Sequence, residues 1–287
     1  MDWMIEPLRK AVGEKPRDVC ARFELANALA SANRHEEAVK ELDQVLALDA
    51  DYERGAGWFN RGNSLRALGR HEEAVTSYDQ ALARPFDDAF AAAHNKALAL
   101  DALGRREQAE AARVQAGELG AAEGKRLFAA GNQHFSAGRH AEAIALYRHS
   151  IARGWPGAHV ALLNGAICHH RENNLEAALE WVDACLRREP EYLPALNHLG
   201  LFQLQAGRPA EALVAFDRGL AVHPDATGHY NRACALARLG RKDQAFAALA
   251  RALELDPATR GDIAAESDFE SLRGDPRFRA LVAGVGD

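Results

Sequence analysis

A short segment recurs along this chain at almost constant spacing, and this regularity constrains the fold more than any other feature. The segment reads Gly-Arg-His-Glu-Glu-Ala-Val or a close variant, and it starts at residues 33, 69, 104, 138, 173, 207 and 240. Periods of this length are typical of solenoids, in which each unit packs only against its neighbours. Aligning the copies gives seven units, which begin at Val19, Gly55, Phe90, Gly124, His159, Leu193 and Ala226.

Three positions within the unit, counted from these starts, indicate how each unit folds. Position 8 is always Ala or Gly, and position 20 is always Ala. Small residues at such places let two facing helices approach closely. Position 15 is Gly or Asn in every unit, and these residue types readily adopt the left-handed conformation that ends a helix. The pattern therefore predicts a helix, a tight turn and a second helix in each unit.

Two units resemble the signature of the tetratricopeptide repeat family, and the resemblance extends over residues 19–258. It implies an all-α, right-handed superhelical solenoid of about seven helix–turn–helix units with capping helices at both ends. The matching residues of the second unit are Trp58, Gly62, Leu65, Gly69, Ala74, Tyr78 and Ala81. Those of the sixth unit are Leu199, Gly200, Ala212, Phe216 and Pro224.

The ends of the array predict four regions. Residues 1–18 are expected to form an N-terminal capping half-repeat, followed by units 1–3 in residues 19–120 and units 4–7 in residues 121–258. Residues 259–287 are expected to form C-terminal capping helices that cover the apolar end of the stack. The alternative is that the tail, residues 268–287, binds a partner.

Unit 3 departs from the pattern. Arg113 stands where an apolar residue belongs, Gly117 lies within the second helix, and Gly120 follows it. We therefore expect a turn between two helices at residues 117–124, where a hinge between units 3 and 4 would also lie. Gly124 and Lys125 lie in this segment, but the spacing and the following Arg126 do not fit a phosphate-binding loop.

Composition excludes several classes of protein. The net charge of −6 lacks the basic footprint of a nucleic-acid-binding domain, and no apolar run approaches the roughly 20 residues that a membrane-spanning helix needs. The N-terminal segment does not resemble a secretory peptide, so we expect a cytoplasmic protein. Its excess of Arg over Lys is typical of GC-rich bacterial genomes. The cysteines Cys20, Cys168, Cys185 and Cys234 form no CxxC pair, which favours reduced thiols.

No catalytic or metal-binding motif stands out. Cys168, His169, His170 and Glu172 are close in sequence, but successive residues of a helix point about 100 degrees apart and cannot all converge on one metal ion. His169 also occupies a position that is Leu in four other units, which favours a histidine in the core. We therefore expect no catalytic residues, no metal and no cofactor, and a protein that is not an enzyme.

The resemblance implies that the first helices of successive units line a concave face. Positions 2, 5, 6, 9, 12 and 13 of the unit, called here the groove positions, then point into a groove. Position 6 is Asn in four units and position 9 is Asn in three. Asn offers both a donor and an acceptor, which suits hydrogen bonding to the backbone of an extended peptide, and relatives hold peptides with a similar ladder of asparagines. The alternative is that these asparagines are ordinary features of the repeat.

The other groove positions are mostly apolar, with a slight excess of basic residues. A carboxylate clamp of the kind found in chaperone-binding relatives is not expected, because Phe59 and Ala129 stand where basic residues belong. The predicted apolar lining also includes Phe23, Phe135, Leu163, Leu201, Leu204 and Tyr230, and the basic residues include Arg66 and Arg171. The predicted peptide-binding residues are Phe59, Asn60, Asn63, Asn95, Lys125, Phe128, Asn132, Asn164, His198, Asn231 and Arg238.

These observations predict a non-catalytic scaffold or adaptor that holds a protein or peptide segment, apolar to mildly acidic in character. Two alternatives stay open, namely a module that self-assembles through its caps or its convex face, and an enzyme with an unrecognised site. Nothing in the sequence determines the oligomeric state.

Overall fold

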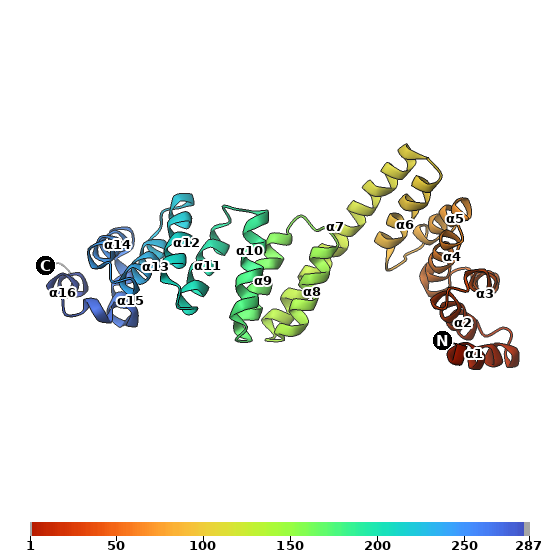
Figure 1. Ribbon diagram of the computed structural model, residues 1–287, viewed down its shortest axis with the longest axis horizontal. Coiled ribbons are helices and arrows are strands. Elements are labelled where there is room, and N and C mark those ends of the chain that lie inside the picture. The colour runs from red at the N-terminus through yellow and green to blue at the C-terminus, as the bar shows by residue number, and fades with distance from the viewer. Residues whose placement is uncertain (1, 284–287) are drawn as a thin grey trace. The chain divides into compact units, whose positions relative to one another are not determined.

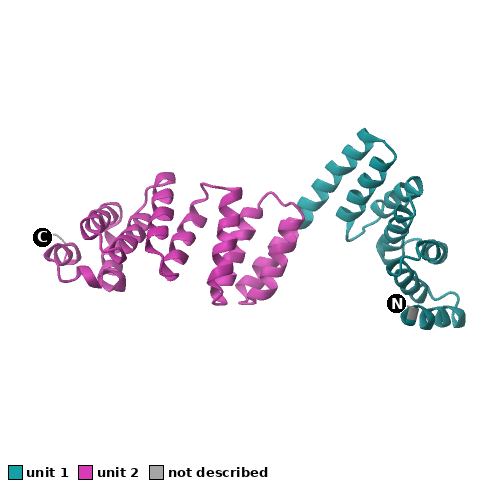
Figure 2. Ribbon diagram, in the orientation of Figure 1, with its two compact units in different colours: residues 1–123 teal, residues 124–287 magenta. Residues whose placement is uncertain are grey.

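A computed structural model describes residues 2–283, and every regular element in that range is a helix. The chain divides into two compact units, residues 1–123 and 124–287 (Figures 1 and 2). They are called the N-terminal and C-terminal halves below, and each is described by itself. Across the described range, no helix combines the length and the apolar character that crossing a bilayer requires.

The N-terminal half contains the cap and the first three repeat units. Its helices follow one another with short connections, and consecutive helices pack together. Their bounds are α1 Asp2–Glu14, α2 Val19–Ser31, α3 His35–Leu48, η1 Tyr52–Gly55, α4 Ala56–Ala67, α5 His71–Leu82 and α6 Ala89–Ala102. The next helix, α7 Arg106–Ser136, begins in this half and ends in the other.

The C-terminal half contains the remaining units and the tail. Its paired helices are α8 His140–Ala152, α9 Ala158–Arg171, α10 Leu175–Arg188, α11 Leu193–Gln205, α12 Pro209–Val222, α13 Ala226–Arg238 and α14 Lys242–Leu255. The tail consists of shorter helices, η2 Pro257–Thr259, α15 Arg260–Ala265, η3 Ser267–Leu272 and α16 Pro276–Ala283.

The predicted turns are confirmed in all seven units. Position 15 has a positive φ in each, between 60° at the two asparagines and 74° at Gly69. A side chain on Gly69 would meet nothing within 4 Å, so the backbone conformation alone favours glycine there. The seven residues are Asn33, Gly69, Gly104, Gly138, Asn173, Gly207 and Gly240.

The predicted small residues lie where the paired helices touch. The alanine at position 20 is 0% exposed in every unit. At position 8, glycine lies against an aromatic ring at position 24: a Cβ on Gly62 would come within 2.7 Å of Tyr78, and one on Gly200 within 2.2 Å of Phe216. Ring and glycine are therefore matched in size, since neither helix has room for an added methyl group.

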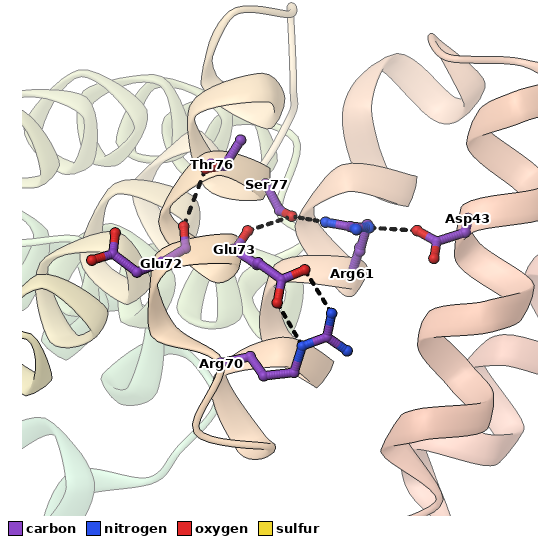
Figure 3. Close-up of polar contacts among 7 residues, drawn as sticks. All are labelled: Asp43, Arg61, Arg70, Glu72, Glu73, Thr76 and Ser77. Carbon is purple, nitrogen blue, oxygen red and sulfur yellow. Dashed lines mark hydrogen bonds and ion pairs between the residues drawn. The ribbon is translucent and has the colours of Figure 1, made fainter.

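A polar link joins neighbouring units within each half. Arg61 of α4 lies between Asp43 of α3 and Ser77 of α5, at 2.7 Å and 2.8 Å (Figure 3). This pair joins position 7 of one unit to position 25 of the preceding one. Lys96 and Asp79 repeat it at 2.6 Å, as do Arg232 and Asp217 at 2.6 Å. Such exposed pairs fix register more than they add stability.

The expected turn at residues 117–124 is wrong. Helix α7 runs through this segment without interruption, from Arg106 to Ser136. The segment contains Ala, Glu, Lys and Arg, which are strong helix formers, and glycines inside a helix cost only about 1 kcal/mol each relative to Ala. The boundary between the two halves falls within this helix, between Glu123 and Gly124. A hinge there stays a prediction.

The N-terminal helix packs as the cap was expected to do. Ile5 and Val12 of α1 are buried in one cluster with Leu25 and Leu29 of α2. The helix therefore shields the apolar side of the first unit from water.

The tail is folded back on the last unit. Phe269, Leu272 and Phe278 are buried in the same cluster as Leu236 of α13 and Leu249 of α14, and Leu281 is half-buried there. Arg277 strengthens this attachment, because it pairs with Asp243 of α14 at 2.8 Å. The last part of the predicted capping region, residues 284–287, lies outside the described residues.

Candidate functional site

The asparagines at the groove positions form pairs that link consecutive units. The side-chain Nδ2 of the asparagine at position 6 donates to the Oδ1 of the asparagine at position 9 in the preceding unit. The three bonds are Asn60 to Asn27 at 2.8 Å, Asn95 to Asn63 at 2.9 Å and Asn164 to Asn132 at 3.0 Å. Every asparagine at position 9 is paired in this way, so these residues stabilise the junctions between units.

Tyrosines complete two of the three pairs. The hydroxyl of Tyr78 donates to Asn63 Oδ1 at 2.9 Å, and that of Tyr147 donates to Asn132 Oδ1 at 2.7 Å. Burial raises the pKa of Tyr78 and of Tyr147 to about 12. Both hydroxyls therefore keep their protons at neutral pH and act as donors.

This arrangement leaves one donor and one acceptor free in each pair. Both bonds to Asn63 are accepted by its Oδ1, so its Nδ2 has no partner within the described residues, and Asn95 donates but accepts no bond through its Oδ1. Asn132 and Asn164 repeat this distribution. A donor beside an acceptor is complementary to the C=O and N–H of a peptide backbone.

An aromatic cluster adjoins each of these two pairs. The ring of Phe59 lies 6.2 Å from Tyr78 and 5.1 Å from Phe86. The ring of Phe128 lies 5.7 Å from Tyr147 and 4.4 Å from Trp155. We call Phe59, Asn63, Tyr78, Phe86 and Asn95 the first set, and Phe128, Asn132, Tyr147, Trp155 and Asn164 the second set; the phenylalanines and asparagines of both are half-buried.

Two other predicted residues lie outside both sets, among the units that follow. Asn231 is only 7% exposed, and no asparagine precedes it, because position 9 of unit 6 is Leu201. His198 shares the carbonyl of Pro194 through Nδ1 at 2.9 Å.

The charged residues predicted for the groove differ from each other. The Arg238 guanidinium pairs with Asp268 at 2.7 Å and donates to the carbonyl of Leu204 at 2.8 Å. Arg238 therefore attaches the tail to the last unit. Lys125, by contrast, is exposed.

Part of the expected apolar lining is wrong. Phe23, Leu163 and Leu204 are all buried, at 8%, 4% and 6% exposure, so they belong to the core. For Phe23 the reason is local, because Tyr52 covers its ring with a centroid distance of 5.1 Å.

Sequence reasoning did not anticipate an apolar recess at the N-terminal cap. The recess lies between α1 and α2 and has a volume of about 630 Å³. Trp3 and Met4 line it and remain 77% and 47% exposed. The signal was present in the sequence, since a capping helix that only covers the next helix has no need of a tryptophan at its start.

Comparison with known proteins identifies the architecture. Models of the tetratricopeptide repeat match residues 3–86 and, in three stretches, residues 59–121, 128–192 and 197–258. The chain belongs to the tetratricopeptide repeat family. That family consists in general of protein-interaction scaffolds without catalytic activity. Among curated proteins, none matches this sequence.

Solved structures with similar folds include several tetratricopeptide repeat proteins. PilW, described as a widely conserved type IV pilus biogenesis factor, is 16% identical, with 88% of this chain and 97% of that one covered and a TM-score of 0.38. A MamA structure is 21% identical, with 55% and 89% covered and a TM-score of 0.45. The Cut9–Hcn1 complex is 16% identical over 81% of this chain, which spans only 45% of that one, with a TM-score of 0.38. These likenesses concern the fold alone.

The Cys168–His169–His170 segment of the fifth tetratricopeptide unit contributes to packing. Cys168 is buried, His169 lies edge-on to Trp181 at 5.3 Å, and His170 stacks on Phe202 at 4.7 Å. The two histidine rings thus contact different helices, α10 and α11. Within residues 2–283, no three His, Cys, Asp or Glu side chains are grouped as metal ligands would be.

Replacing His169 with Leu, the residue at this position in four other tetratricopeptide units, should stabilise the C-terminal half. Both ring nitrogens of His169 are buried without a hydrogen-bond partner, which costs about 1 to 3 kcal/mol. Burial, the nearby Arg148 and weaker opposing effects of Glu172 and Glu180 together lower the pKa of His169 below its usual value of 6.5. Protonation therefore favours the unfolded chain, and the stability of the neutral form is lost as pH falls from 6.5 through the folded-state pKa.

Denaturant unfolding between pH 5 and 8 tests this prediction. The gain of His169→Leu over the native chain should widen below pH 6.5, since only the native chain takes up a proton at this position on unfolding. A gain that does not change with pH would show that the ring is hydrated rather than held neutral in the core.

Proposed function

We propose that this tetratricopeptide repeat chain is a non-catalytic scaffold that holds an extended peptide segment of a partner protein on the groove positions of its first helices. The observation that carries the proposal is the free donor and acceptor of each asparagine pair. Their partners within the fold hold them in place, so little side-chain entropy is lost when a peptide binds. The adjoining Phe59 and Phe128 provide an apolar surface for a side chain of that peptide.

The lack of sequence-specific groups in the pairs favours recognition of backbone rather than of one residue type. Amide groups bind any extended backbone that can approach them. Specificity then comes from the apolar contact and from charge. The exposed Lys125 and the half-buried Arg66 support a partner segment that is apolar to mildly acidic.

The double variant Asn95→Ala with Asn164→Ala should lose peptide binding by at least about tenfold, since each substitution removes one free acceptor, equivalent to about 1.4 kcal/mol or more. The probe is a peptide enriched from a phage-displayed library of random dodecapeptides on the full chain. Binding is measured by isothermal titration calorimetry. Because both asparagines also donate across unit junctions, we expect thermal unfolding to shift as well, in contrast to a purely surface-exposed site.

The matched control is Tyr78→Phe with Tyr147→Phe. It removes the other hydrogen bond to the same Asn63 and Asn132 oxygens, and Phe216 shows that phenylalanine fits at this position. It should destabilise the chain comparably and leave peptide affinity within about twofold. Equal loss of binding in both double variants would mean that stability, not the free acceptor, determines binding.

The cysteines support a cytoplasmic location for this scaffold. All four lie in the described residues and are unpaired, and three of them are buried. Unpaired thiols are usual in reducing compartments.

Self-assembly is the second candidate function, and the exposed Trp3 beside its recess favours it. A second chain could bury this tryptophan, as homo-oligomers commonly do with apolar patches. Light scattering on the same samples tests it, since a mass equal to one chain of 31.2 kDa at high protein concentration would exclude it.

A further inference from the structure

The two sets defined above are related by a fixed shift along the chain. Each residue of the first set has its counterpart 69 residues later, and four of the five counterparts are identical. The fifth exchanges one aromatic residue for another, Phe86 for Trp155. Since the two sets lie in different compact halves, each half carries one complete copy.

The geometry of the two copies agrees closely. The tyrosine hydroxyl lies 2.9 Å from Asn63 in the first set and 2.7 Å from Asn132 in the second. The asparagine of the next unit donates at 2.9 Å and 3.0 Å. The phenylalanine lies 6.2 Å and 5.7 Å from the tyrosine ring. Each copy therefore leaves the same donor and acceptor free beside the same apolar ring.

A guanidinium group adjoins each copy, although it comes from a different position. In the first, Arg66 lies near the hydroxyl of Tyr78, where it opposes part of the rise in the tyrosine pKa that burial causes. The position of Arg66 holds Phe135 in the second, and the Arg171 guanidinium lies 5.5 Å above that ring. Within the described residues, neither arginine forms an ion pair, and Arg66 Nε is buried without a partner.

The set does not occur a third time. A further shift of 69 residues places Asn197 at the phenylalanine, Leu201 at the position-9 asparagine and Phe216 at the tyrosine. The pair Asn27–Asn60 also lacks the tyrosine, because position 24 of unit 1 is Leu42. The duplication therefore limits the complete arrangement to two copies.

We propose that the chain carries two equivalent peptide sites and binds two copies of the same segment, one in each half. This inference rests on the proposed function. The segment is extended, with a backbone amide on the free asparagine atoms, an apolar side chain on Phe59 or Phe128, and an acidic side chain at Arg66 or Arg171. A partner with the segment repeated, or two copies of one partner, gains affinity by occupying both sites.

Calorimetry with a single synthetic peptide on the full chain tests the stoichiometry. The probe is the most enriched dodecapeptide from the phage-displayed random library. We expect two molecules of peptide per chain, with Kd values for the two sites within about fivefold of each other. One molecule per chain would overturn the inference and leave the proposed function standing, whereas a library without any enriched peptide would overturn both.

Two single substitutions assign the sites without removing the contacts that hold the units together. Asn63→Asp keeps an oxygen that accepts from Tyr78 and Asn95 but replaces the free N–H donor with a second acceptor, and Asn132→Asp does the same in the second set. Each should reduce the stoichiometry from two to one and leave the remaining Kd unchanged, and the double variant should bind none. Asn197→Ala, an asparagine outside both sets, should still bind two.

Tryptophan fluorescence distinguishes the two sites directly. Trp155 packs on Phe128 in the second set, so its emission should change with peptide in the native chain and in Asn63→Asp, but not in Asn132→Asp. Phe86→Trp with Trp155→Phe moves the reporter to the first set and should reverse this pattern. A signal that follows the same variant in both backgrounds would overturn the equivalence of the sites.

Discussion

Replacing Phe269 with Ala should destabilise the C-terminal half by about 3 to 5 kcal/mol, the range for truncating a fully buried phenylalanine. Phe269 is 0% exposed, and its ring lies 5.8 Å from Tyr230 and 6.3 Å from Phe278. The tail can rearrange little around the resulting cavity, because Asp268 is held by Arg238 at 2.7 Å. Denaturant unfolding measures the loss.

Hydrogen exchange shows where that loss falls. In a repeat array each unit contacts only its neighbours, so exchange should accelerate in α13 and α14 and stay unchanged in α2 and α3. Val214→Ala is the control: Val214 is 61% exposed, and its removal should cost no more than about 0.5 kcal/mol. If Phe269→Ala behaved like this control, the tail would not act as a cap, and its role as a partner-binding segment would gain support.

The sequence predicted most reliably what depends on one residue and its own backbone. The left-handed residue that ends each first helix requires Gly or Asn, and all seven such positions have the expected φ. The buried Ala74 and its equivalents are also predictable, since close helix packing restricts the size of a single side chain. Both columns repeat through the array, so an error at one unit would have been visible against the others.

Burial was harder to predict, because it depends on neighbours that differ between units. Helical geometry places Phe23 and Phe59 at the same position of the first helix, yet Phe23 is buried and Phe59 is half-buried. The difference comes from Tyr52, which lies in a connection that only the longest unit provides. The uninterrupted α7 has a similar cause: its glycines weaken a helix but do not require it to end.

The asparagine pairs could have been predicted from the sequence but were not. Asparagines at positions 6 and 9 had been considered as separate columns, each facing a ligand. Every asparagine at position 9 is followed by one at position 6 of the next unit, as in Asn63 and Asn95. That coincidence already indicates contact across the junction, and it leaves half of the donors and acceptors for a ligand.

The second large effect is expected for Gly200→Ala, which should destabilise the chain by about 2 kcal/mol. The new Cβ would meet the Phe216 ring at 2.2 Å, and this ring is 0% exposed and cannot turn aside. Overpacking of this kind costs about 1 to 3 kcal/mol and outweighs the roughly 1 kcal/mol that Ala gains over Gly in a helix. Thermal and denaturant unfolding measure the result.

Phe216→Leu in the same chain should relieve the clash, because units 1 and 7 already combine Ala at position 8 with Leu at position 24, as Ala26 does with Leu42. The double variant should therefore be about as stable as Phe216→Leu alone, so that the two changes couple by about 2 kcal/mol rather than add. Gly117→Ala is the control, since its Cβ would meet nothing within 4 Å and should stabilise α7. Additive costs for the first pair would mean that the ring and the glycine are not matched, and that the alternation of glycine and alanine at position 8 has another cause.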